Sequence, residues 1–186
     1  MSKSAEVKTR LSIQAAHEQI NPIDLLDDVI YLDKKGIERC WTSDHNMPWW
    51  DTGASGGAAW PWIGAALAKT TQLVIGTGVT APILRYHPAI VAQVFATLAY
   101  MFPKRVFLGL GRGEALNEVP SGNIWPTNIE KFRRLRESIK LIKNYGHKTG
   151  LLLVENFIQS KIPIYILNPL TQFRYISLVW AYNLLN

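Results

Sequence analysis

The chain has 186 residues, of which 48% are hydrophobic, enough for one domain with a sizeable core. Only 18% of the residues are charged, which argues against a disordered chain. The formal charge of +6 is scattered apart from the run KFRRLRESIKLIK (131–143), so we expect neither nucleic acid nor a membrane surface as a partner.

The single cysteine, Cys40, excludes an internal disulfide and suits a reducing compartment. It lies in an apolar run, which favours a core residue over a nucleophile. The first residues, MSKSAEVKTR, lack the apolar segment of a signal peptide, and no uninterrupted apolar run has the length of a membrane-spanning helix. These features predict a cytoplasmic protein.

Short apolar runs alternate with segments of helical periodicity, at a spacing typical of βα units. The expected strands are residues 8–15, 38–42, 72–79, 105–110 and 162–166. The expected helices are residues 22–36, 60–70, 88–101 and 128–144. Strands that read as continuous apolar runs are buried on both faces, so we expect an α/β fold with a parallel sheet flanked by helices.

Two of the expected helices have clear local signals. Asn21 followed by Pro22 is typical of an N-cap and first helical residue, and Gly36 of a helix end. The residues expected on one side of this first helix are Ile23, Leu26, Val29 and Ile30. In the last helix, helical spacing relates Phe132, Leu135, Ile139 and Ile142, so its Arg and Lys residues are expected on a solvated face.

The segments that follow the expected strands are long and rich in Gly, Pro, His and Trp. They cover residues 43–57, 80–87 and 111–127, whereas the segments before the strands have only a few residues. In parallel α/β folds, ligands bind at the carboxyl ends of the strands. We therefore expect the functional site in these three segments.

The first of these segments opens with SDHNMPWW (43–50). His45 is a candidate for proton transfer, with Asp44 hydrogen-bonded nearby, but the pair also suits a loop held together by these side chains. Trp49 and Trp50 suit either stacking on a planar ring or covering the mouth of a barrel.

Glycines mark the other two segments. Gly76 and Gly78 would let a flat ligand approach the backbone, or would allow a bulge. GLGRGEALNE (109–118) lacks the G-x-G-x-x-G spacing and follows the fourth strand, so a dinucleotide loop is rejected. Its glycines, with Glu114 and Asn117, would instead line a pocket. Arg85 and Arg112 suit either an anionic group or the surface.

Several functional classes lack their signature. The four histidines are far apart and have no HxxxH or CxxC setting, so no metal site is expected. The sequence contains neither G-x-S-x-G nor G-x-x-x-x-G-K-[ST]. Hydrolase and nucleoside-triphosphatase functions are therefore not expected.

Four blocks of sequence together resemble one known family. They are SDHNMPWW (43–50), AWPWIGAALAKT (59–70), GTGVTAPILRYHPAIVAQVFATL (76–98) and RVFLGLGRGEALNEVP (105–120). In this order they resemble the luciferase-like superfamily of (β/α)8 barrels, in the branch of F420-dependent glucose-6-phosphate and secondary alcohol dehydrogenases. The resemblance covers about residues 8–143, and it implies the N-terminal part of a TIM barrel with about four to five βα units.

The resemblance implies a role for each matching residue. His45 would take the substrate hydroxyl proton, Trp49 would stabilise the reacting intermediate, and Glu114 would donate a proton to the cofactor. The implied cofactor contacts, of which the Gly78–Val79 bond would be cis, are Asp44, His45, Gly78, Val79, Thr80, Gly113 and Asn117. The implied chemistry is hydride transfer between an alcohol or hemiacetal carbon and coenzyme F420, a deazaflavin.

The sequence departs from the family after Lys143. Residues 1–166 are expected to form a partial barrel, and residues 167–186 an apolar tail unlike the family. Family members are longer, so the chain resembles a truncated one. Four or five βα units cannot close an eight-stranded barrel, and the exposed sheet edge favours a homo-oligomer.

Three functions are carried forward from the sequence. The first is an F420-dependent oxidoreductase, or a fragment of one, acting on a small alcohol or sugar. The second is an FMN-dependent luciferase-like monooxygenase on the same fold. The third is a non-catalytic half-barrel that self-associates, for which the apolar segment 175–185 is the supporting feature.

Overall fold

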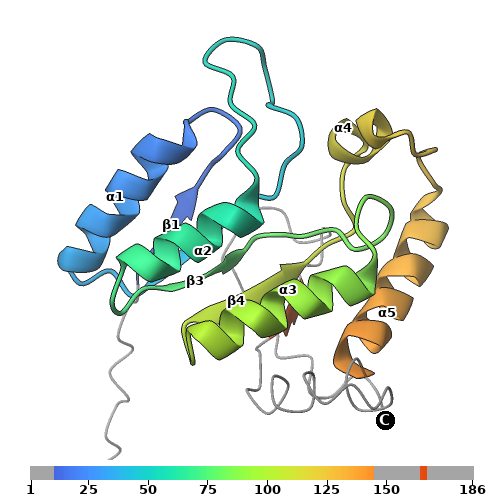
Figure 1. Ribbon diagram of the computed structural model, residues 1–186. Coiled ribbons are helices and arrows are strands. Elements are labelled where there is room, and N and C mark those ends of the chain that lie inside the picture. The colour runs from blue at the N-terminus through green and yellow to red at the C-terminus, as the bar shows by residue number, and fades with distance from the viewer. Residues whose placement is uncertain (1–10, 145–163, 167–186) are drawn as a thin grey trace, which may run out of the picture.

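The computed structural model describes residues 11–144 and 164–166, and within them five parallel strands form one sheet. In sheet order, which is also chain order, they are β1 (Ser12–Ala15), β2 (Arg39–Thr42), β3 (Val74–Thr77), β4 (Val106–Leu110) and β5 (Ile164–Ile166). Every neighbouring pair is parallel. Strands β1, β3 and β4 are labelled in Figure 1. The predicted α/β fold with a parallel sheet is confirmed.

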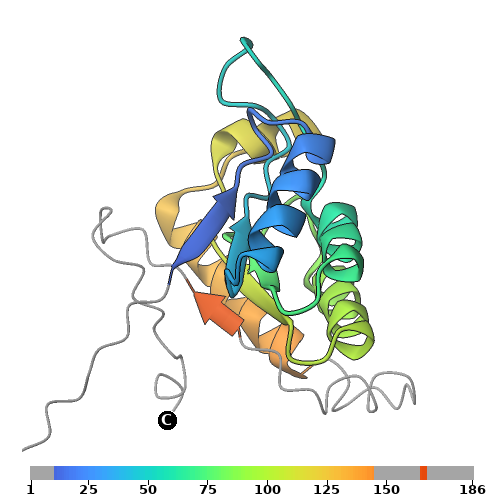
Figure 2. The ribbon, with the colours of Figure 1, turned by 90° about the vertical axis from the view of Figure 1, so that its left-hand side faces the viewer.

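Four long helices connect and cover the strands: α1 (Pro22–Lys34), α2 (Ala59–Lys69), α3 (Pro88–Met101) and α5 (Asn128–Asn144). Contacts join α1 to α2 and α3 to α5, so the helices form a layer beside the sheet (Figure 2). The core between the two layers includes Ile63, Ile75, Phe95 and Leu108. Across residues 11–144, no helix is both long and apolar enough to cross a membrane.

The predicted element bounds hold best for the helices. Helices α3 and α5 begin and end where predicted, and the Asn21 carboxamide oxygen caps α1 by accepting from the backbone N–H groups of Ile23 and Asp24. The strands are shorter than predicted. In β3, Leu73 is excluded because its N–H donates to the Asp33 carboxylate rather than to a neighbouring strand. Residues 8–10 and 162–163 of the predicted strands lie outside the described residues.

Two predictions about helix faces were wrong. Ile23 is 72% exposed and Phe132 is 61% exposed, although both were expected on buried faces. Ile23 is the second residue of α1 and Phe132 is the fifth residue of α5, so both lie near the N-terminal end of their helix. The buried residues of α1 are instead Leu25, Val29 and Asp33, which are spaced four residues apart and so form one ridge along the helix.

The face of the sheet away from the helices is only half covered in the described residues. Burial alternates along β2, where Cys40 and Thr42 are buried while Arg39 and Trp41 are half-buried. The expectation of strands buried on both faces therefore fails at this end of the sheet, because the helices cover one face alone. Cys40 is a core residue as predicted, and burial raises the pKa of its thiol to about 12.

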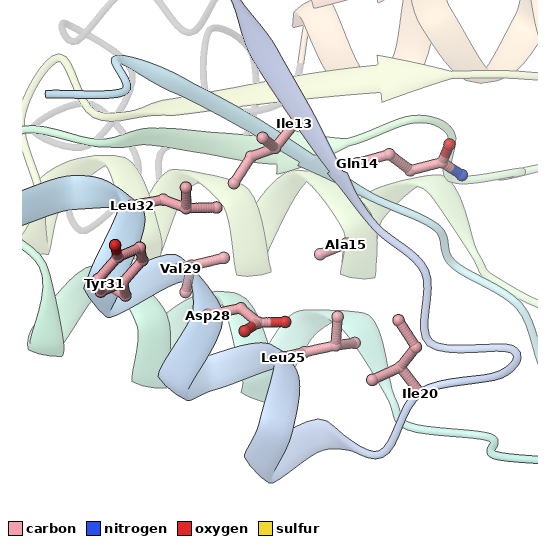
Figure 3. Close-up of a pocket in the computed structure, with 9 residues that line it drawn as sticks. All are labelled: Ile13, Gln14, Ala15, Ile20, Leu25, Asp28, Val29, Tyr31 and Leu32. Carbon is pink, nitrogen blue, oxygen red and sulfur yellow. The ribbon is translucent and has the colours of Figure 1, made fainter. Parts of the chain in front are cut away.

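Strand β1 forms one edge of the sheet, since β2 is its single partner within the described residues. Between β1 and α1 opens a cavity of about 400 Å³, which we call the β1–α1 groove. Figure 3 shows side chains of the two elements facing each other across it. Its apolar lining consists of Ile13, Ala15, Ile20, Leu25, Val29 and Leu32, and its polar lining of Gln14, Asp28 and Tyr31.

A short helix was not predicted. Helix α4 (Ala115–Glu118) and the 3-10 turn η1 (Val119–Ser121) lie within the segment that follows β4 (Figure 1). Four residues are too few for a helical periodicity to be recognised in the sequence. The effect of α4 is to place Asn117 and Glu118 in buried positions.

Candidate active site

The three long segments predicted to carry function do meet at the carboxyl ends of the strands. Asp44 and His45 follow β2, Thr80 and Arg85 follow β3, and α4 follows β4. Hydrogen bonds link Asp44 to Thr80 and to Arg85, and join Asn117 of α4 to the segment after β2. The three segments are therefore in contact, and that they form a functional site stays a prediction.

Asp44 holds the segments after β2 and β3 together. Its buried carboxylate accepts from the Thr80 hydroxyl at 2.7 Å and the Tyr86 hydroxyl at 3.1 Å. The Arg85 guanidinium donates to the Asp44 carbonyl oxygen at 2.7 Å and lies 3.4 Å from its carboxylate. Burial raises the pKa of Asp44, although the Thr80 hydrogen bond and the Arg85 charge oppose the rise. Asp44 therefore fixes the backbone beside His45.

Glu118 completes what we call the Asp44–Arg85–Glu118 network. It is fully buried, accepts from the Arg85 backbone N–H at 2.8 Å, and lies 3.8 Å from the guanidinium. Burial raises the pKa of Glu118, and Arg85 opposes the rise. Burial and the nearby Asp44 charge raise the pKa of Tyr86, whose ring lies under the guanidinium. Of the two surroundings left open for Arg85, an anionic group or the surface, the structure gives the first, because the guanidinium faces the buried carboxylates of Asp44 and Glu118.

His45, Trp49 and Glu114, the three predicted catalytic residues, lie together. The His45 Nε2 atom is 3.4 Å from a Glu114 carboxylate oxygen, and the Trp49 ring stands edge-on to the imidazole at 5.7 Å between centroids. The His45 side chain is 15% exposed and that of Glu114 is 63% exposed. An imidazole and a carboxylate at this separation are suited to proton transfer once a substrate is bound.

Glu18, which was not predicted as a site residue, also lies beside His45. Its Oε1 atom is 3.6 Å from His45 Nε2, and its side chain is fully buried. In the structure, Glu18, His45 and Thr80 are each the third residue after β1, β2 and β3, but the third strand was predicted to end at residue 79, which hid this spacing in the sequence. Because Ala15, Thr42 and Thr77 are aligned in the sheet register, equal offsets bring these residues to one edge.

His17 was also missed as a buried residue. Its ring packs edge-on against Trp62 at 4.9 Å, and Gly57 leaves the space that the ring occupies. Burial lowers the pKa of His17, although the charge of Glu18 opposes this. The neutral ring therefore serves as packing behind the site.

Asn117, predicted to contact the cofactor, is buried against the His45 segment. Its carboxamide oxygen accepts from the backbone N–H groups of Asn46 at 2.8 Å and Met47 at 3.3 Å. It therefore fixes the loop between His45 and Trp49. Its cofactor contact stays a prediction.

Some glycines of the site make room for neighbouring side chains, and another provides an unusual backbone conformation. At Gly76 and Gly78 the rings of Phe107 and Trp41 occupy the space where a β-carbon would lie, so these glycines make room for aromatic side chains. The Gly78–Val79 peptide bond is cis, as the resemblance implied, and Gly113 has a left-handed φ of 69° beside Ala81 and Glu118.

Comparison with known proteins supports the family. Residues 7–147 match the family described as luciferase-like monooxygenase. An F420-dependent glucose-6-phosphate dehydrogenase of Beutenbergia cavernae is 47% identical over 134 residues, which are 72% of this chain and 40% of that protein. One from Nakamurella multipartita is 44% identical over 133 residues, which are 72% of this chain and 39% of that protein.

Solved structures share the fold of this chain. An F420-dependent secondary alcohol dehydrogenase in complex with an F420-acetone adduct is 42% identical with a TM-score of 0.72, over 74% of this chain and 42% of that one. The coenzyme F420-dependent tetrahydromethanopterin reductase of Methanopyrus kandleri, 20% identical with a TM-score of 0.62 over 86% of this chain and 50% of that one, shares the fold. This chain spans about 40% of the length of the curated relatives it matches. It belongs to the luciferase-like monooxygenase family.

Proposed function

We propose that this chain carries the cofactor-binding part of an F420-dependent oxidoreductase that acts on an alcohol or hemiacetal carbon. The observation that carries the proposal is the position of His45, whose Nε2 atom lies 3.6 Å from a Glu18 carboxylate oxygen and 3.4 Å from one of Glu114, with Trp49 beside the imidazole. The relatives that share these segments are named for F420 and for glucose 6-phosphate or secondary alcohols. A small alcohol or sugar is accordingly the substrate class we propose.

The residues of the site suit a flat, polar cofactor. Trp49 is 49% exposed, so part of its ring is open to stacking. Within the described residues, His45 Nδ1 and Glu18 Oε1 are buried without a hydrogen-bond partner, which leaves polar atoms for a ligand to satisfy. The residues that would hold the cofactor are Asp44, His45, Gly78, Val79, Thr80, Gly113 and Asn117. When bound, F420 would supply the acceptor for the hydride.

The chain's own residues would manage the proton. His45 accepts the proton that the substrate hydroxyl loses, since its imidazole is held beside two carboxylates that attract a positive charge. Glu114 is exposed enough to exchange a proton with solvent. Trp49 shields the imidazole from water on one side.

Titration of oxidised F420 into the full chain, followed by F420 fluorescence, tests the proposal. We expect micromolar binding, and about tenfold weaker binding for His45→Ala, which corresponds to about 1.4 kcal/mol. Ile129→Ala, an exposed position on α5, is the control and should bind like the unchanged chain. Binding of FMN in place of F420 would assign the chain to the monooxygenase branch, and binding of neither would contradict the proposal.

We also infer that the chain forms a homo-oligomer through the edge of β1. The edge of β1, which has β2 as its single partner in the part of the chain that the structure describes, and the apolar β1–α1 groove support this inference. Sedimentation velocity should show a concentration-dependent oligomer that Ile13→Lys converts to a monomer, because Ile13 lies on the edge strand and lines the groove. Ile23→Lys places the same charge on an exposed position outside the groove, and should change nothing. A monomer at all concentrations would contradict the inference.

A further inference from the structure

We propose that Trp50 is a specificity-determining residue, which together with Trp49 binds the ring of an uncharged, ring-bearing alcohol. The side chains of Trp49 and Trp50 are called the aromatic shelf below. The inference rests on the proposed function, in which His45 receives the hydroxyl proton of the substrate, and it narrows the substrate class. Trp50 contacts the body of the substrate in this proposal, away from the reacting atoms.

The aromatic shelf continues from the imidazole of His45. The ring centroids of His45 and Trp49 are 5.7 Å apart, and those of Trp49 and Trp50 are 6.0 Å apart with an angle of 45° between the ring planes. Both separations lie in the range of about 4.5–7 Å that aromatic rings in contact adopt. Three rings therefore follow one another, starting at the proposed base.

Both tryptophans leave much of their surface open to a ligand. Trp50 is 59% exposed, Trp49 is 49% exposed, and the nearby Met47 is 39% exposed. Single exposed apolar side chains are common on protein surfaces, but three within four residues make a concentrated apolar surface, which is typical of a binding site. An indole also has a flat apolar face that stacks on the ring of a ligand.

The loop that carries the aromatic shelf is held on both sides. Before the shelf, the Asn117 carboxamide oxygen accepts from the Met47 N–H at 3.3 Å. At the shelf, the Gln19 side-chain amide donates to the Trp50 carbonyl oxygen at 3.2 Å. The segment between β2 and α2, to which this loop belongs, projects beyond the neighbouring elements in both views of the ribbon (Figure 1 and Figure 2). A shelf fixed in this way needs little ordering when a ligand stacks on it.

The charges at this edge of the sheet favour an uncharged substrate. The segments that follow the first four strands contain five acidic residues and two arginines; they are residues 16–21, 43–57, 78–87 and 111–121. One of the arginines, Arg85, is only 11% exposed and faces the carboxylates of Asp44 and Glu118. An anionic group on the substrate would therefore meet mostly negative charge here.

The order of the rings decides which alcohols gain from Trp50. A small open-chain alcohol with its hydroxyl at His45 Nε2 has a carbon skeleton that reaches no further than Trp49. A ring on the carbinol carbon extends the substrate along the row of rings to Trp50. Trp50 therefore distinguishes ring-bearing alcohols from small ones.

The test is a titration of 1-phenylethanol into the full chain without cofactor, followed by NMR of the tryptophan indole N–H signals. Trp49→Phe and Trp50→Phe assign the two signals of the shelf. We expect both signals to shift, with a dissociation constant about fivefold larger for Trp50→Ala and intermediate for Trp50→Phe, which keeps an aromatic face.

Two controls separate the aromatic shelf from a general loss of binding. 2-Propanol should bind the unchanged chain and Trp50→Ala alike, because it does not reach Trp50. Tyr100→Ala removes a ring that is also 59% exposed, near the C-terminal end of α3 and so away from the site, and should bind 1-phenylethanol like the unchanged chain.

An unmoved Trp50 signal, or a Trp50→Ala chain that binds 1-phenylethanol as tightly as the unchanged chain, would overturn the proposal. Tighter binding of glucose 6-phosphate than of 1-phenylethanol would overturn the uncharged substrate class. A chain that binds F420 but not 1-phenylethanol would overturn the aromatic shelf alone. A chain that binds 1-phenylethanol at Trp50 but not F420 would support the shelf and contradict the proposed function.

Discussion

Replacing Arg85 by methionine is expected to lower the free energy of unfolding by about 3–5 kcal/mol and to abolish F420 binding. The variant leaves the buried carboxylates of Asp44 and Glu118 without their positive partner. It also frees the Asp44 carbonyl oxygen, which fixes the backbone next to His45. Urea unfolding followed by circular dichroism, together with the F420 titration, measures both effects.

The decrease in the free energy of unfolding of the Arg85→Met chain should depend on pH. Burial raises the pKa values of Asp44 and Glu118 above their unfolded values, and Arg85 opposes the rise. Without Arg85 the folded chain holds these protons more tightly than the unfolded chain, so the variant should gain stability as the pH falls from 7 to 5. Equal destabilisation at both values would contradict the buried network.

Arg134→Met is the matched control for Arg85→Met. Arg134 also pairs with a carboxylate, Glu130, at 2.8 Å, but both side chains are more than 40% exposed. Exposed ion pairs contribute about 0.2–1 kcal/mol. A similar loss in the two variants would show that burial does not set the strength of the Arg85 network.

Asp33→Asn is expected to lower the free energy of unfolding by about 3 kcal/mol at pH 7. The buried Asp33 carboxylate accepts four hydrogen bonds: from the N–H groups of Thr71, Gln72 and Leu73 and from the Thr71 hydroxyl. An asparagine has the same shape but turns an N–H₂ group toward these donors. The connection from α2 to β3 would lose its anchor on α1.

The destabilisation caused by Asp33→Asn should become smaller as the pH falls. Burial raises the pKa of Asp33, but the hydrogen bonds from Thr71, Gln72 and Leu73 outweigh it and lower the pKa overall. The contribution of Asp33 is therefore complete above the unfolded pKa of about 3.9 and is lost as the pH falls through the folded value. Urea unfolding at pH 7 and pH 3.5 should show the Asp33→Asn difference shrinking at the lower pH. Asp27→Asn, exposed on the same helix, should show no such difference.

The order of strands and helices could be predicted from the sequence, because each βα unit has a hydrophobic periodicity and capping residues of its own. Pro88 and Asn128 mark the first residues of α3 and α5 as predicted, and Asn21 caps α1. His45, Trp49 and Glu114 were found from motif blocks in register, and the structure brings all three together. Local signals were enough for the helix bounds, whereas the three site residues were named through the family resemblance.

The tertiary structure alone decided which polar groups became buried partners. Glu18 and Glu118 carry no local signal of burial, since an isolated charged residue in a loop is usually exposed. They are buried because parallel register and the short α4 helix bring Glu18 to His45 and Glu118 to Arg85, 27 and 33 residues away in sequence. Contacts across such separations depend on how whole βα units pack against each other. The hydrophobic periodicity within one unit does not predict which residues of two units will come into contact.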